Sequence, residues 1–82
     1  MDYEVRKCKG KAALNSNLRK NVKIDLLSKA KFFKCLVETS PMLIVDYKGM
    51  MINIYENGKI RIPTLDENKA RDTADELYKV LL

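Results

Sequence analysis

The sequence contains no histidine, and this absence removes the side chain that enzymes use most often as a general base. Histidine is also the commonest transition-metal ligand, and the two cysteines, Cys8 and Cys35, cannot complete a tetrahedral zinc site by themselves. The three glycines stand singly, so the chain has no glycine-rich phosphate-binding loop. We therefore expect a non-enzymatic protein with no catalytic residues, no cofactor and no metal.

Long hydrophobic runs are also lacking. The longest uncharged apolar stretch surrounds residues 42–45, far short of the ~20 residues that a membrane-spanning helix needs. The N-terminal residues include acids and no apolar segment, which predicts no signal peptide. We therefore expect a cytoplasmic protein that makes no membrane contact and has free thiols. A disulfide between Cys8 and Cys35 stays open as an alternative, although two small, at least half-buried hydrophobic side chains are favoured.

What the sequence does have is an uneven positive charge. The 82 residues suit one domain, 1–82, and their 46% hydrophobic content is typical of a folded chain. The formal net charge is +5, but residues 1–34 hold ten Lys or Arg and three Asp or Glu, whereas residues 35–82 hold six and eight. The excess of positive charge therefore belongs to the N-terminal part.

The N-terminal part begins with a strand pattern and then loses its periodicity. Residues 2–8 alternate apolar and polar side chains, which indicates a half-buried strand. Residues 9–21 are small, polar and basic, and their Asn-Ser-Asn centre predicts a loop. The spacing of Leu14 and Leu18 leaves a short helical turn as an alternative.

A helical period begins at Asp25, which is a good N-cap residue. Leu26, Ala30 and Phe33 then fall on one stripe, whereas Phe32 lies off it and is interpreted as an edge-packing residue. Residues 33–39 fit both a continued helix and a strand, because their apolar side chains satisfy both periods. The segment ends before Pro41, since a residue that precedes proline avoids the helical region.

The second half predicts an antiparallel meander followed by a helix. Residues 42–47, 50–56 and 59–63 alternate as strands, and Asn57-Gly58 between the last two indicates a type I′ hairpin turn. The expected core side chains of this meander are Leu43, Val45, Ile52, Ile54, Ile60 and Ile62.

A C-terminal amphipathic helix should cover this meander. Thr64 and Glu67 have the spacing of a capping box at its start. One face of the helix is apolar, with Ala70, Ala74, Leu77, Tyr78 and Leu81. The acids Asp66, Glu67, Asp72, Asp75 and Glu76 are interpreted as a solvated face rather than a metal site. The predicted class is therefore α+β, with an antiparallel sheet of 4–5 strands and two helices on one face, in the order β-α-(β)-β-β-β-α.

Two stretches resemble a half-repeat of the TATA-box-binding protein family. The segment 22–30 reads VKIDLLSKA and is similar to the start of that family's first helix. The hairpin IYENGKIRI and the acidic helix after it resemble the family's hairpin and closing helix, so that the likeness spans roughly residues 22–80. The resemblance implies that 33–39 is a strand. Family members carry two such repeats, whereas this chain has one.

The same resemblance assigns expectations to single residues. Tyr55 matches one of the phenylalanine wedges that the family inserts into the DNA minor groove, and Met42 falls near the other. Lys59 and Arg61 stand where the family has small apolar residues.

Two surfaces emerge as candidates for function. If both helices cover one face of the sheet, strand alternation directs seven side chains to the opposite face: Met42, Ile44, Met51, Asn53, Tyr55, Lys59 and Arg61. The second surface is the basic set in or beside the predicted loop: Arg6, Lys7, Lys9, Lys11, Arg19, Lys20 and Lys23. The alternative for the sheet face is that the loop at 9–21 folds across it.

These surfaces predict a small binding module that uses the exposed sheet face for a protein partner or a second copy of itself. The alternative is a nucleic-acid-binding protein, in which the basic loop contacts phosphates and Tyr55, Lys59 and Arg61 lie on the contacting face.

Overall fold

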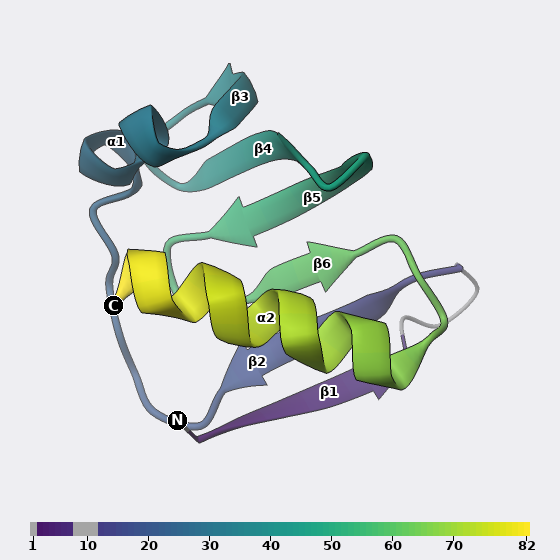
Figure 1. Ribbon diagram of the computed structural model, residues 1–82. Helices are drawn as coiled ribbons and strands as arrows, with labels where there is room; N and C mark the ends of the chain where they lie inside the picture. Colours follow the sequence, from purple (N-terminus) through teal and green to yellow (C-terminus); the bar gives the residue numbers. More distant parts are fainter. Residues whose placement is uncertain (1, 8–11) are drawn as a thin grey trace.

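The computed structural model describes residues 2–7 and 12–82, and it shows one antiparallel sheet crossed on one face by a long helix (Figure 1). The elements are β1 (Tyr3–Lys7), β2 (Leu14–Leu18), α1 (Leu26–Lys29), the 3-10 turn η1 (Ala30–Phe32), β3 (Lys34–Glu38), β4 (Met42–Tyr47), β5 (Met50–Tyr55), β6 (Ile60–Ile62) and α2 (Glu67–Leu81). Across the sheet the strand order is β1-β2-β6-β5-β4-β3. The α+β class is therefore confirmed. Neither of the helices in the described part of the chain is long and apolar enough to cross a membrane.

The core lies between the sheet and the helices, and strand alternation decides which residues enter it. All six side chains expected there are 0% exposed: Leu43, Val45, Ile52, Ile54, Ile60 and Ile62. From α2, Ala70, Ala74, Leu77, Tyr78 and Leu81 complete the same cluster, as the apolar stripe predicts. Leu26 and Ala30 also belong to this cluster, so α1 packs on the same side of the sheet as α2.

The predicted loop at 9–21 is wrong over residues 14–18, which form β2 between β1 and β6. Only alternate side chains of β2 face the core, and one of them is a serine, so the segment lacks an apolar pattern. The Ser16 hydroxyl is buried and lies 2.8 Å from the Tyr78 hydroxyl. This hydrogen bond offsets the cost of burying a polar side chain. The sheet therefore has six strands rather than 4–5, and the order is β-β-α-β-β-β-β-α.

Residues 33–39 follow the strand alternative, as the family resemblance implies. The Asp25 carboxylate accepts from the Ser28 backbone N–H at 3.4 Å, which confirms the predicted start of α1. The helical run then ends within two turns, because Phe33 takes an extended φ of −130°. The Phe33 ring packs edge-on against Tyr47, with 6.5 Å between ring centroids. This contact holds the chain where it enters β3.

Two predictions about local caps and turns are wrong. The cap of α2 is Asp66, whose carboxylate accepts from the backbone N–H groups of Asn68 and Lys69, instead of Thr64. The Asn57-Gly58 turn is not of type I′, because Gly58 alone has a positive φ, +89°. Its N–H donates to the Tyr55 carbonyl, which gives a type I turn with a glycine bulge.

Tertiary packing explains why the Asn57-Gly58 turn is not of type I′. A Cβ at Gly58 would lie 2.3 Å from Leu18 Cδ1, so β2 closes over this turn. The type I′ geometry occurs instead at the β4–β5 hairpin, where Lys48 and Gly49 have φ values of 53° and 76°.

Candidate binding face

The sheet face opposite α2, which we call the open face, is the candidate site. Strand register and alternation assign fourteen side chains to it: Glu4, Arg6, Asn15, Asn17, Lys34, Val37, Met42, Ile44, Asp46, Met51, Asn53, Tyr55, Lys59 and Arg61. Each of them is at least partly exposed. Residues 12–21 form β2 and part of the connection to α1, so they do not cover this face (Figure 1).

The register brings the residues of this face into continuous rows. One row crosses all six strands and contains Arg6, Asn15, Arg61, Asn53, Ile44 and Val37. In a neighbouring row Met42 lies opposite Tyr55. The Lys59 ammonium sits 5.7 Å from the centroid of the Tyr55 ring, within cation–π range. The structure therefore brings together the seven side chains that alternation directs outward.

Sequence reasoning missed several members of this face, above all Asn15 and Asn17. Their signal was present, because they alternate with Leu14, Ser16 and Leu18. The Asn-Ser-Asn run was interpreted as a turn instead, since these residue types also favour loops. Placing them on β2 extends the face from the meander to the N-terminal edge of the sheet.

The open face has an apolar half and a polar, cationic half. Over β3, β4 and β5 it presents mostly apolar side chains, Val37, Met42, Ile44, Met51 and Tyr55, with Met51 60% exposed, and beside them Lys34, Asp46 and Asn53. Over β1, β2 and β6 it presents Arg6, Asn15, Asn17, Lys59 and Arg61. A ligand that spans the sheet would therefore meet apolar surface on one side and hydrogen-bond donors with positive charge on the other.

The positive charge at the centre of this face is not neutralised. Both carboxylates of the face are already paired, Glu4 with Arg6 at 3.0 Å and Asp46 with Lys34 at 3.9 Å. Within residues 2–7 and 12–82, neither Lys59 nor Arg61 forms an ion pair. The central strands therefore present two cations that have no carboxylate partner.

Beside these cations lies a hydrogen-bond acceptor without a partner. In the described part of the chain, Asn15 Oδ1 is buried and accepts no hydrogen bond. The register places Asn15 directly opposite Arg61, whose guanidinium carries five donors. A buried acceptor that accepts no hydrogen bond costs free energy.

The basic set predicted to contact nucleic acid is not brought together as a whole. Arg6 lies on the open face, whereas strand alternation places Lys7, the next residue of β1, on the face that α2 covers. Arg19 pairs with Asp2 at 3.3 Å. This pair lies at the opposite end of the β1–β2 hairpin from Arg6, and a strand of five residues separates the two ends by about 13 Å.

Two further members of that set, Lys20 and Lys23, lie outside the strands that form the open face. Lys20 is exposed just beyond Arg19, and Lys23 borders a small cleft beside Ile24 and Glu56. The predictions for Lys9 and Lys11, like that for Cys8, concern residues outside those that the structure describes.

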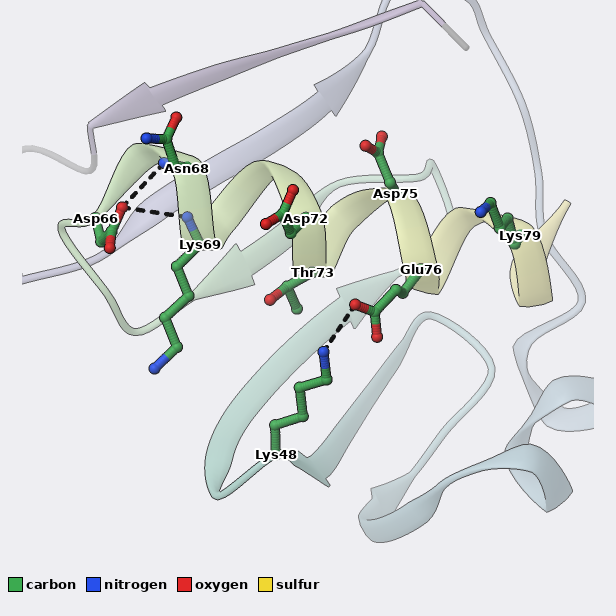
Figure 2. Close-up of a pocket in the computed structure, with 9 residues that line it drawn as sticks. All are labelled: Lys48, Asp66, Asn68, Lys69, Asp72, Thr73, Asp75, Glu76 and Lys79. Carbon is green, nitrogen blue, oxygen red and sulfur yellow. Dashed lines mark hydrogen bonds and ion pairs between the residues drawn. The ribbon is translucent and has the colours of Figure 1, made fainter.

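A large shallow cavity of about 640 Å³ runs along the outer side of α2, and two of its acids, Asp75 and Glu76, make structural contacts (Figure 2). Glu76 accepts from Lys48 Nζ at 2.7 Å and from the Tyr47 hydroxyl at 2.5 Å. The hydrogen bonds from Lys48 and Tyr47 lower the pKa of Glu76 below its ordinary value. Asp75 accepts from the Tyr3 hydroxyl at 2.6 Å. These acids tie α2 to the sheet, and the described residues contain no cluster of three metal-ligating side chains.

The thiol of Cys35 is half-buried and free, and it donates to the Ala30 carbonyl at 3.5 Å. Burial raises its pKa, which disfavours the thiolate form that reacts as a nucleophile. Cys35 is therefore a packing residue between β3 and η1.

Comparison with known proteins finds no family model, no curated protein and no solved structure that matches the chain. The resemblance of residues 22–80 to a TATA-box-binding half-repeat therefore stays a prediction from the motifs quoted above.

Proposed function

We propose that the protein is a non-enzymatic binding module whose open face binds single-stranded nucleic acid. The observation that carries this proposal is the pair of cations Lys59 and Arg61, which form no ion pair within residues 2–7 and 12–82 and lie near Tyr55 on the open face. An anionic ligand supplies the charge that this face lacks.

The two halves of the open face suit the two parts of a nucleotide strand. Lysine and arginine contact phosphates, so Lys59 and Arg61 provide the electrostatic part of the affinity. Tyr55 and the exposed Met51 offer apolar surface on which unpaired bases stack or pack. Bases in a duplex are already stacked and paired, so only a single strand can use the apolar half.

A second copy of the chain fits the open face less well. Two copies placed face to face would bring Lys59 and Arg61 of each copy against a surface whose only carboxylates, Glu4 and Asp46, are already paired. Such a dimer would bury unpaired like charges, which costs free energy. The resemblance to a DNA-binding family agrees with the choice of nucleic acid, although Lys59 and Arg61 replace apolar groove-contacting residues and favour phosphates over groove insertion.

The test is a salt titration with labelled oligonucleotides of about twelve nucleotides, single-stranded DNA, single-stranded RNA and a duplex of equal length. Fluorescence anisotropy should show binding of the single strands at about 50 mM salt, tighter than binding of the duplex, and weakening as salt rises. The double variant Lys59→Ala/Arg61→Ala should lower the slope of log K against log salt by about 1.4, because each phosphate contact on a single strand contributes ~0.7.

The matched control removes the same charge from the outer side of α2, in the double variant Lys69→Ala/Lys79→Ala. Its affinity for single strands should fall much less than that of Lys59→Ala/Arg61→Ala. Equal losses in the two variants would show that net charge alone drives binding and would overturn the proposal. Three other results would also overturn the proposal. They are the absence of oligonucleotide binding at about 50 mM salt, tighter binding of polyglutamate, and a dimer that light scattering shows to form through the open face.

A further inference from the structure

Exposed apolar side chains gather at one corner of the molecule, away from the centre of the open face. Among residues 2–7 and 12–82, seven large hydrophobic side chains are exposed, and four of them come from α1, η1 and β3: Leu27, Phe32, Leu36 and Val37. Figure 1 shows these three elements together at one end of the sheet. Phe32 is 58% exposed and Leu36 53%, values that folding of this domain does not explain.

The corner also has an unused strand edge. β3 is the last strand of the sheet and pairs only with β4, so its outer edge carries backbone groups with no neighbouring strand. A β-bulge between Cys35 and Val37 interrupts the strand, which limits main-chain pairing along this edge. Affinity for a partner here must therefore come largely from side chains.

The part of the corner formed by α1 and η1 is positively charged, whereas β3 carries the acid Glu38 at its end. Between Leu26 and Leu36 the sequence contains three lysines and no acid. Lys34 pairs with Asp46, whereas within the described ranges Lys29 and Lys31 form no ion pair. The Lys31 ammonium lies 5.3 Å from the centroid of the exposed Phe32 ring, so charge and apolar surface are adjacent.

We propose that this β3 corner, defined by Leu27, Lys29, Lys31, Phe32 and Leu36, docks an extended segment of another protein in which acidic and apolar side chains alternate. The segment runs along the outer edge of β3. Its apolar side chains pack on Phe32 and Leu36, and its carboxylates face Lys29 and Lys31. A second copy of the corner is a poor occupant, because it would bring lysines against lysines and a bulge against a bulge.

The test uses a short synthetic peptide in which Glu and Leu alternate, and a second peptide in which Lys and Leu alternate. We expect the acidic peptide to bind saturably and to shift backbone amide signals of residues 26–38 in a heteronuclear NMR titration. The double variant Phe32→Ser/Leu36→Ser should weaken that binding about tenfold, as the loss of two central apolar contacts does at protein interfaces. Charge reversal in Lys29→Glu/Lys31→Glu should abolish it and allow the basic peptide to bind.

The control for the apolar substitutions is Leu65→Ser, because Leu65 is 56% exposed but lies between β6 and α2. That variant and Lys59→Ala/Arg61→Ala should bind the acidic peptide as the wild type does, so the docking corner and the open face are tested separately. Equal binding of both peptides, signal shifts that map to the open face, or unchanged binding by Phe32→Ser/Leu36→Ser would overturn the proposal. Concentration-dependent self-association that the Lys29→Glu/Lys31→Glu variant abolishes would identify a second copy instead and would also overturn it.

Discussion

The two faces of the sheet are built from alternate residues of the same strands, yet their side chains differ in kind. In β5, Ile52 and Ile54 face α2 and are 0% exposed, whereas Met51, the residue before Ile52, is 60% exposed on the open face. The covered face needs only apolar volume that fits against α2. The open face contains arginine, lysine, asparagine and tyrosine, and packing against α2 requires none of these residue types. The difference teaches that the covered face explains stability, and the open face is where we propose that a ligand binds.

The largest expected effect comes from truncating neighbouring residues of β5 on opposite faces. Ile52→Ala should lower the free energy of unfolding by about 2–4 kcal/mol, because it removes fully buried methyl groups and leaves a cavity. Met51→Ala, one residue earlier, should change it by less than about 0.5 kcal/mol. Urea unfolding followed by circular dichroism measures both. A comparable loss in Met51→Ala would mean that the open face is covered by part of the folded chain and would break the comparison.

A smaller effect is expected at the two glycine turns of the meander. Gly58 has a φ of +89°, and a Cβ there would approach Leu18 Cδ1 to 2.3 Å, whereas Gly49, with φ +76°, has nothing within 4 Å of its Cβ position. Gly58→Ala should therefore cost about 2 kcal/mol, from backbone strain plus displacement of Leu18, and Gly49→Ala about 1 kcal/mol from strain alone.

Thermal unfolding of the two alanine variants side by side separates these contributions. Equal losses would show that β2 does not close over the Gly58 turn and that packing plays no part in selecting its geometry.

The smallest effect concerns the polar contacts that hold α2 on the covered face. Hydrogen bonds from Lys48 and Tyr47 lower the pKa of Glu76 below 4.5, so its carboxylate stabilises the folded state above that pH. The stabilisation is lost as pH falls below 4.5 through the folded-state pKa. In Glu76→Gln, the melting temperature should therefore be lower than in the wild type at roughly pH 6, and the difference should shrink as the pH falls below 4.5. A difference that persists unchanged at the lower pH would show that Glu76 acts through packing rather than charge.

The candidate site was predictable to the extent that it depends on strand alternation. The alternating pattern of 42–62 assigned Met42, Ile44 and Met51 to one face and their neighbours to the core, and the burial of those neighbours confirms the assignment of faces. The cationic half of the face was only partly predictable. Lys59 and Arg61 followed from the same pattern, but Asn15 and Asn17 lie on a strand whose weak alternation is also typical of a turn.

The basic residues show that counting charges along the sequence does not predict which face of the fold carries them. Composition places most of the positive charge in residues 1–34, yet the fold sends Arg6 and Lys7 to opposite faces and pairs Arg19 with Asp2. Position along the chain cannot show this, because the direction of each side chain depends on which strands pair and in what register.

The sequence by itself determined the meander, its core residues and the apolar stripe of α2, because these depend on periods of two and 3.6 residues that are local. Only the tertiary structure decided that 14–18 is a strand. Its Leu-Asn-Ser-Asn-Leu pattern has no clear local preference for a strand. Its hydrogen bonds come from β1, β6 and the hydroxyl of Tyr78, which lies 62 residues from Ser16 along the chain. The turn at Gly58 was decided in the same way, by Leu18 packing against it. Long-range contacts therefore completed the sheet and, with it, the face that we propose as the binding site.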